Sequence, residues 1–303
     1  LVSASLEIGP GGSASFDLAR LVRWPDGATP RAVTIASAYS GQLFDVSRDG
    51  TRVTIRARDE AQPGRAESIT VSLPDHPEVR PMALSLVVGP APSELPKGGA
   101  VTPTCSQAVG DSCTFDVVAV AGEVNPLPGT PLEVVEVTAA GDCADVRFAV
   151  AGAGQVRASW SADAAGGVCD AVFSVRDAQG RVSGVDRAGS ISLDLQGFPR
   201  APAAVRQVAY GDGTLTLGVE AGRAAGAYPA LAGFDIMAGS ARVATCTAAG
   251  ACTPITGLEN GLKTAYTAYA VNGVGRSRTG QSVTAWAYAP PAAPRVVSWT
   301  PTV

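Results

Sequence analysis

The sequence predicts an all-β protein that folds as tandem β-sandwich domains in an extended rod. Short runs of residues alternate between apolar and polar side chains along the chain, as half-buried strands do. The 35 glycines and 22 prolines are spread between these runs, where they supply turns. Because 303 residues exceed one small sandwich, we expect two or three domains.

The first domain is expected over residues 1–89. The dipeptide Asp49-Gly50 separates two alternating runs and predicts a β-hairpin, since both residue types tolerate a positive φ. Short strands separated by such turns fit a β-sandwich. The runs that we interpret as strands cover residues 15–18, 32–35, 43–46, 53–55, 68–73 and 84–87.

A proline-rich segment at residues 89–93, GPAPS, predicts a semi-rigid linker to a second sandwich over residues 90–198. The segment Gly152-Ala153-Gly154 lacks the further glycine and the helix of a phosphate-binding loop, so it predicts a hairpin turn. The expected strands of this domain cover residues 113–118, 132–137, 146–150, 156–161, 171–176 and 190–195.

A second proline-rich linker, GFPRAP at residues 197–202, leads into a third sandwich over residues 199–289. Residues 290–303 have the pattern of the start of a further module, so we expect the chain to be a fragment of a longer protein. The expected strands of the third domain cover residues 205–209, 214–219, 232–237, 242–246, 252–255, 264–271 and 282–288.

Residues 257–277, GLENGLKTAYTAYAVNGVGRS, contain a turn and then a long alternating strand that ends at an Asn-Gly pair. This stretch resembles the late strands of a fibronectin type III module. Two positions depart from the family pattern. Val219 stands where that family usually has a tryptophan, and the usual corner tyrosine falls on Thr264, with Tyr266 two residues later.

The segment FSVRDAQG, residues 173–180, precedes the closing strand of the second domain. It resembles the ending of bacterial Ig-like, cadherin-like tandem repeats, and the first domain resembles this class in pattern only. The bias toward Ala, Arg, Gly and Val with few lysines is typical of a high-GC bacterium such as an actinobacterium. The resemblances imply a bacterial surface protein with Ig-like repeats and a fibronectin type III domain.

Six cysteines with local spacing predict disulfides and an oxidising compartment. Sequential pairing would keep each bridge within one domain, although six cysteines allow fifteen pairings. Zinc is the alternative, but the sequence contains no C-x2-C spacing. The cysteines are Cys105, Cys113, Cys143, Cys169, Cys246 and Cys252.

The sequence does not predict an enzyme, a nucleic-acid-binding protein or a membrane span. His76 is the only histidine and lies in a predicted turn, without a paired nucleophile. The net charge is −4 and no basic cluster is interleaved with aromatics. No cofactor is expected, with calcium as a minor alternative. The carboxylates considered for calcium are Asp142, Asp145, Asp163, Asp170 and Asp177.

The loop at residues 272–278, NGVGRSR, is the candidate ligand-contact site. Loops at the ends of a sandwich often carry recognition, and arginine is favoured at protein interfaces. The candidate ligand contacts are therefore Asn272, Arg276 and Arg278.

We expect a non-enzymatic, extracellular stalk or adhesin fragment that presents a protein-binding surface at a bacterial cell surface. One alternative is a receptor-like module that captures a host protein, such as a cytokine or a matrix component. Another is an accessory region of a secreted carbohydrate-active enzyme, which would need exposed aromatics clustered on one face. The tryptophans are Trp24, Trp160, Trp286 and Trp299, of which Trp160 and Trp286 are predicted as core or sheet-face residues.

Overall fold

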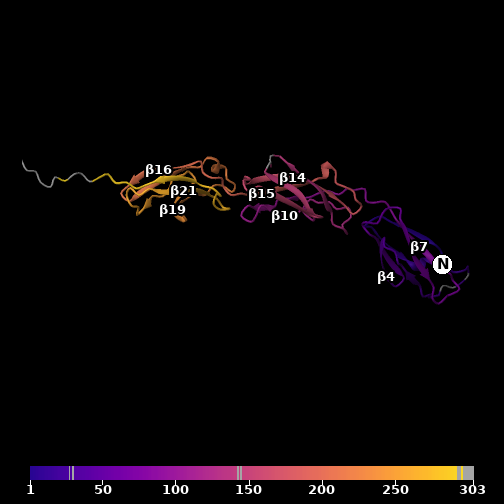
Figure 1. The fold of residues 1–303 in the computed structure, drawn as a ribbon. Helices are drawn as coiled ribbons and strands as arrows, with labels where there is room; N and C mark the ends of the chain where they lie inside the picture. The colour runs from indigo at the N-terminus through magenta and orange to yellow at the C-terminus, as the bar shows by residue number, and fades with distance from the viewer. Residues whose placement is uncertain (27, 29–30, 142, 144, 292–294, 296–303) are drawn as a thin grey trace, which may run out of the picture.

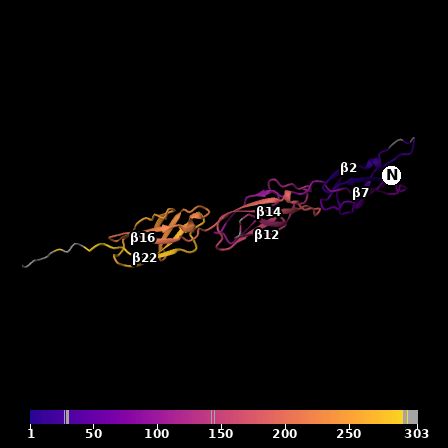
Figure 2. The same ribbon diagram turned by 90° about the horizontal axis from the view of Figure 1, so that it is seen from above.

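The computed structural model describes residues 1–26, 28, 31–141, 143, 145–291 and 295. It contains three β-sandwiches, each with its own buried core. Figures 1 and 2 show the sandwiches in a row in two perpendicular views, which confirms the predicted all-β rod. The further module predicted over residues 290–303 lies outside the described residues, apart from three positions.

The N-terminal sandwich packs a sheet of order β1-β7-β6-β3 against a sheet of order β2-β5-β4. β1 runs parallel to β7, while the other neighbours are antiparallel. A short 3-10 helix, η1 (Leu18–Leu21), follows β2 and buries both of its leucines. The strands are β1 (Ala4–Ile8), β2 (Ser13–Asp17), β3 (Ala36–Ala38), β4 (Phe44–Asp49), β5 (Arg52–Ala57), β6 (Ala66–Ser72) and β7 (Met82–Val88).

The hairpin predicted at Asp49-Gly50 is confirmed. Asp49 pairs with Arg52, and Gly50 has a φ of 58°, a value that glycine adopts without steric cost.

The strand predicted over residues 32–35 is wrong, because residues 31–35 are irregular and β3 begins at Ala36. The carbonyl of Ile35 accepts a hydrogen bond from the guanidinium of Arg48 at 2.5 Å. A side chain therefore satisfies this backbone group in place of a neighbouring strand. Ile35 still buries its side chain, which explains the alternating pattern of the segment.

The middle sandwich packs a sheet of order β10-β13-β12 against a sheet of order β11-β14-β15-β8, and β9 also pairs with β15. The predicted turn at residues 152–154 connects β12 to β13, and this hairpin contains a bulge. The strands are β8 (Ala100–Val101), β9 (Thr104–Ser106), β10 (Ser112–Asp116), β11 (Glu133–Ala140), β12 (Val146–Gly152), β13 (Gln155–Trp160), β14 (Gly167–Arg176) and β15 (Gly189–Gln196).

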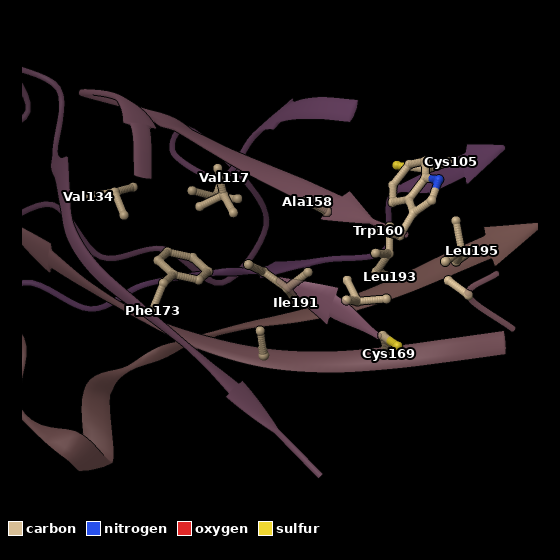
Figure 3. Close-up of a cluster of buried hydrophobic side chains, with 14 of the residues drawn as sticks. Cys105, Val117, Val134, Ala158, Trp160, Cys169, Phe173, Ile191, Leu193 and Leu195 are labelled. Carbon is tan, nitrogen blue, oxygen red and sulfur yellow. The ribbon is translucent and has the colours of Figure 1, made fainter. Parts of the chain in front are cut away.

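The core of the middle sandwich lies between the two sheets, where Phe173 and Trp160 are its large aromatic members (Figure 3). Phe173 is 1% exposed, and it leaves no space beside Gly189. A Cβ added at Gly189 would lie 2.2 Å from the Phe173 ring. Trp160 is buried as predicted, and its indole N–H donates to the carbonyl of Gly110 at 3.2 Å.

The C-terminal sandwich packs a sheet of order β16-β17-β20 against a sheet of order β19-β18-β21-β22. The long strand predicted over residues 264–271 is confirmed as β21. Short 3-10 helices, η2 (Val185–Arg187) and η3 (Gly222–Gly226), interrupt the strands of the middle and C-terminal sandwiches. The strands are β16 (Ala204–Gly211), β17 (Thr214–Glu220), β18 (Gly233–Ala238), β19 (Ala241–Thr247), β20 (Ile255–Thr256), β21 (Thr264–Val271) and β22 (Gln281–Ala285).

Tyr266 on β21 and Phe234 on β18 are the large aromatic core residues of the C-terminal sandwich, each 2% exposed. Val219, at the position where the resembled family has a tryptophan, is also buried in this core. Tyr266, Phe234 and aliphatic side chains therefore fill the space between these sheets. Within the described ranges, no helix has the length and apolarity needed to cross a membrane.

Candidate functional site: the joints between the sandwiches

The first joint connects the N-terminal sandwich to the turn between β14 and β15. The side-chain amide of Gln179 donates to two backbone carbonyls of the N-terminal sandwich, those of Asp59 and Ala61, the latter at 3.0 Å. Arg181 donates to the carbonyl of Pro92 in the linker. The guanidinium of Arg181 is itself held by Asp177 at 2.7 Å, and that carboxylate is fully buried.

Close packing supports the hydrogen bonds of the first joint. Leu127 in the loop before β11 is fully buried, and its Cδ2 would lie 3.3 Å from a Cβ added at Gly11. A Cβ added at Gly129 would lie 2.5 Å from a guanidinium nitrogen of Arg56. A side chain at position 129 would therefore displace the guanidinium of Arg56 or the buried carboxylate of Asp59, so the two sandwiches are closely packed here.

The second joint connects the linker at residues 197–202 to the turn between β21 and β22. Nδ2 of Asn272 donates to the carbonyls of Gly197 at 2.8 Å and Pro229 at 3.0 Å. Oδ1 of Asn272 accepts from the N–H groups of Val274 at 3.0 Å and Gly275 at 3.2 Å. One carboxamide therefore joins the linker to the C-terminal sandwich and shapes its own turn.

On the other side of the second joint, the linker is bonded to the middle sandwich. The N–H of Phe198 donates to Oε1 of Gln107 at 2.9 Å, and Nε2 of Gln107 donates to the carbonyl of Ala164 at 2.9 Å. Gln107 is 4% exposed. The guanidinium of Arg278 lies over the ring of Phe198, 5.3 Å from its centroid, as in a cation–π contact. The Phe198 segment is thus fixed from both sandwiches.

The predicted ligand contacts lie at this joint or next to it. Asn272 is buried and bonded to the linker, and Arg278 lies on Phe198. Arg276 forms an ion pair of 2.7 Å with Asp235 and lies over the ring of Tyr269. We expected Asn272 to lie in an exposed loop, but it is buried because the preceding linker covers this turn. The sequence signal that could have indicated this docking is Phe198, an aromatic residue within the proline-rich linker.

Two of the three expected disulfides are formed, Cys105–Cys113 and Cys246–Cys252. The third expected disulfide, between Cys143 and Cys169, is not formed, and both residues are free thiols in the structure. The two thiols are neighbours. Burial, and then the hydrogen bond with Cys143, raises the pKa of Cys169 to about 12. A thiol with this pKa is a poor nucleophile at neutral pH.

Glu67 on β6 holds the irregular segment after β3 in place through hydrogen bonds. Its carboxylate accepts hydrogen bonds from the hydroxyl of Tyr39 and from the N–H groups of Gln42 at 2.9 Å and Leu43 at 3.0 Å. Burial raises the pKa of Glu67, but these hydrogen bonds outweigh it, so its pKa lies below the ordinary 4.5. Burial and the bond to Glu67 raise the pKa of Tyr39 to about 12. This cluster has a structural role.

His76 lies in the turn between β6 and β7, as predicted, and its Nδ1 is 3.0 Å from a carboxylate oxygen of Glu78. No group of three His, Cys, Asp or Glu side chains suited to a metal ion occurs among the described residues. Of the carboxylates considered for calcium, Asp177 is buried against Arg181, and Asp142 lies outside the described residues.

An exposed aromatic cluster lies on the C-terminal sandwich, formed by Tyr210, Trp286 and Tyr288. They are 64%, 39% and 45% exposed. The rings of Tyr210 and Tyr288 meet edge to face with centroids 5.8 Å apart, and Nζ of Lys263 lies 5.3 Å from the Trp286 ring. With Gln207 these three aromatics line a cavity of about 360 Å³. Trp299 lies outside the described residues.

No protein-family model and no curated protein matches the chain. Similar solved structures include domains A168–A170 of titin (12% identity, TM-score 0.41, 94% of this chain and 96% of that chain covered). They also include mouse protocadherin-24 EC1–3 (13% identity, TM-score 0.35, 95% and 97% covered) and chicken CNTN1 FN1–FN3 (10% identity, TM-score 0.30, 84% and 88% covered). At these identities and TM-scores, the likeness assigns no activity to the chain.

Proposed function

We propose that this chain is a non-enzymatic stalk segment of an extracellular protein on a bacterial surface, which holds a protein-binding surface at a fixed distance. The main support for the proposal is the pair of joints. Gln179 bonds the middle sandwich to the backbone of the N-terminal sandwich, and Asn272 bonds the C-terminal sandwich to the backbone of the preceding linker. Domains joined only by a linker move relative to one another by default. Directed hydrogen bonds across both joints oppose that motion.

Three further features support a stalk. The linkers are rich in proline, which keeps the chain extended. Two disulfides close short loops, which stabilises sandwiches outside the cell by restricting the unfolded chain. The turn that we expected to contact a ligand is engaged within the rod, and this favours spacing over capture of a host protein by that turn.

The test is the distribution of distances between the N-terminal and C-terminal sandwiches, measured across both joints. Spin labels attached through unnatural amino acids at the exposed positions Thr51 and Ala248 would be measured by pulsed electron spin resonance. We expect a narrow distribution for the native chain and a broader one for Gln179→Ala with Asn272→Ala. The matched control is Gln155→Ala, whose amide bonds Asp116 within one sandwich. A native distribution as broad as that of the double variant would refute a fixed spacer.

A second candidate, sugar binding by an accessory domain of a carbohydrate-active enzyme, is favoured by the cluster of Tyr210, Trp286 and Tyr288. Exposed rings that line a cavity offer flat faces to the C–H surface of a sugar. A glycan array probed with the native chain would test it. We expect Trp286→Ala to abolish any signal, and Val208→Ala, an exposed apolar change on β16, to preserve it. A silent native chain would remove this candidate.

A further inference from the structure

A cavity of about 440 Å³ lies beside the second joint and is lined by three arginines. Arg200 comes from the linker, Arg223 from η3, and Arg278 from the segment before β22. Residues around Asp163 of the middle sandwich complete the wall. The cavity therefore combines side chains of both sandwiches, although these are far apart in the sequence.

The arginines are positioned without being neutralised. Nη2 of Arg200 donates to the backbone carbonyl of Asp163 at 2.8 Å, and Arg278 lies on the ring of Phe198. In the part of the chain that the structure describes, none of the three forms an ion pair. Asp163 is the one acidic residue among the described residues of the lining, so three positive charges face one negative charge.

This charge balance selects an anionic ligand. A guanidinium presents a planar fork of N–H donors that matches the oxygens of a carboxylate or a sulfate. The volume lies in the range of small-molecule sites. We infer that the cavity binds an acidic sugar, a uronic acid or a sulfated residue of a glycan chain.

The walls favour a sugar over an acidic peptide. Pro199 and Pro202 are buried in the wall and have no backbone N–H to pair with a peptide. Peptides that add to sandwiches usually bond to a free strand edge, whereas residues 198–203, which form much of this wall, lie outside the strands. The prolines and Phe198 instead give apolar contacts for the C–H face of a ring, while Gln281 in the lining can bond a hydroxyl.

The experiment is calorimetric titration of residues 1–303 at low salt with four probes. These are a heparin-derived hexasaccharide, its desulfated counterpart, trigalacturonate and hexaglutamate. We expect the sulfated or the uronic probe to bind, and Arg223→Gln with Arg200→Gln to weaken that binding at least tenfold. Arg223→Gln alone, which touches no bond of the joint, should weaken it severalfold.

The matched control is Arg65→Gln with Arg80→Gln, which removes the same charge from exposed positions on the N-terminal sandwich. It should change the affinity less than twofold. An equal loss in this control would show non-specific attraction and overturn the site. Equal binding of hexaglutamate would overturn the sugar class, and no binding of either acidic sugar would overturn the proposal. Trp286→Ala should leave this binding unchanged, which separates the site from the aromatic cluster.

Discussion

Replacing Asn272 by alanine removes four hydrogen bonds at the second joint while leaving the backbone in place. The carbonyls of Gly197 and Pro229 lose their donor, and the N–H groups of Val274 and Gly275 lose their acceptor. Asn272 is 6% exposed, so water reaches these groups poorly in the folded chain. We expect both a less stable C-terminal sandwich and a looser joint.

The magnitude follows from the number of bonds. A net hydrogen bond contributes about 0.5–1.5 kcal/mol, and a buried group left unpaired costs about 1–3 kcal/mol. Partial entry of water after truncation lowers the sum, so we expect a loss of about 2–4 kcal/mol in the free energy of unfolding of the C-terminal sandwich. With a urea slope of about 2 kcal/mol/M, the midpoint should fall by about 1–2 M.

The assay is urea unfolding of residues 1–303 followed by peptide-resolved hydrogen exchange, which reports each sandwich separately. The control is Asn260→Ala. Asn260 also accepts one backbone bond and donates to a carboxylate, but it is exposed, so its loss should cost less than about 1 kcal/mol. Equal midpoints for the two variants would refute the reasoning, as would a loss spread evenly over all three sandwiches.

Three more predictions concern the sandwiches themselves. Glu67 has a lowered folded pKa, so its stabilisation is present above the unfolded value of 4.5 and is lost as the pH falls through the folded pKa. The free energy of unfolding of the N-terminal sandwich, measured as a function of pH, should show this loss. The Glu67→Gln variant should lack that part of the pH dependence. Gly189→Ala should destabilise the middle sandwich by about 1–3 kcal/mol in urea through overpacking, whereas Gly226→Ala, with open space at its Cβ, should be nearly neutral. Mild oxidation should link Cys143 to Cys169, and peptide mapping that finds two free thiols afterwards would contradict the proximity described here.

The strands could be predicted from the sequence because their signal is local. Alternation over residues 264–271 gave β21, and Asp49-Gly50 gave the hairpin of β4 and β5. The segment before Ala36 was misjudged because a long-range bond from Arg48 replaces the ladder there. An alternating pattern of apolar and polar residues indicates which side chains are buried. The side chain of Ile35 is buried whether its backbone bonds a neighbouring strand or an arginine side chain.

The joints could not be predicted, since each depends on two segments that are distant in the sequence. Gln179 bonds residues 118 to 120 positions away, and Asn272 bonds Gly197, 75 positions away. The proline-rich linkers indicated that joints exist, but not what holds them. The arginine-lined cavity was missed for the same reason, because Arg200, Arg223 and Arg278 share no local pattern.

In both joints the donor is a carboxamide in the turn before the last strand of the later sandwich, and the acceptor is a main-chain carbonyl that precedes that sandwich. Every residue type carries such a carbonyl. At the acceptor positions themselves, these bonds therefore place little demand on side-chain identity. Substitutions there would keep this part of the attachment as long as the backbone keeps its course.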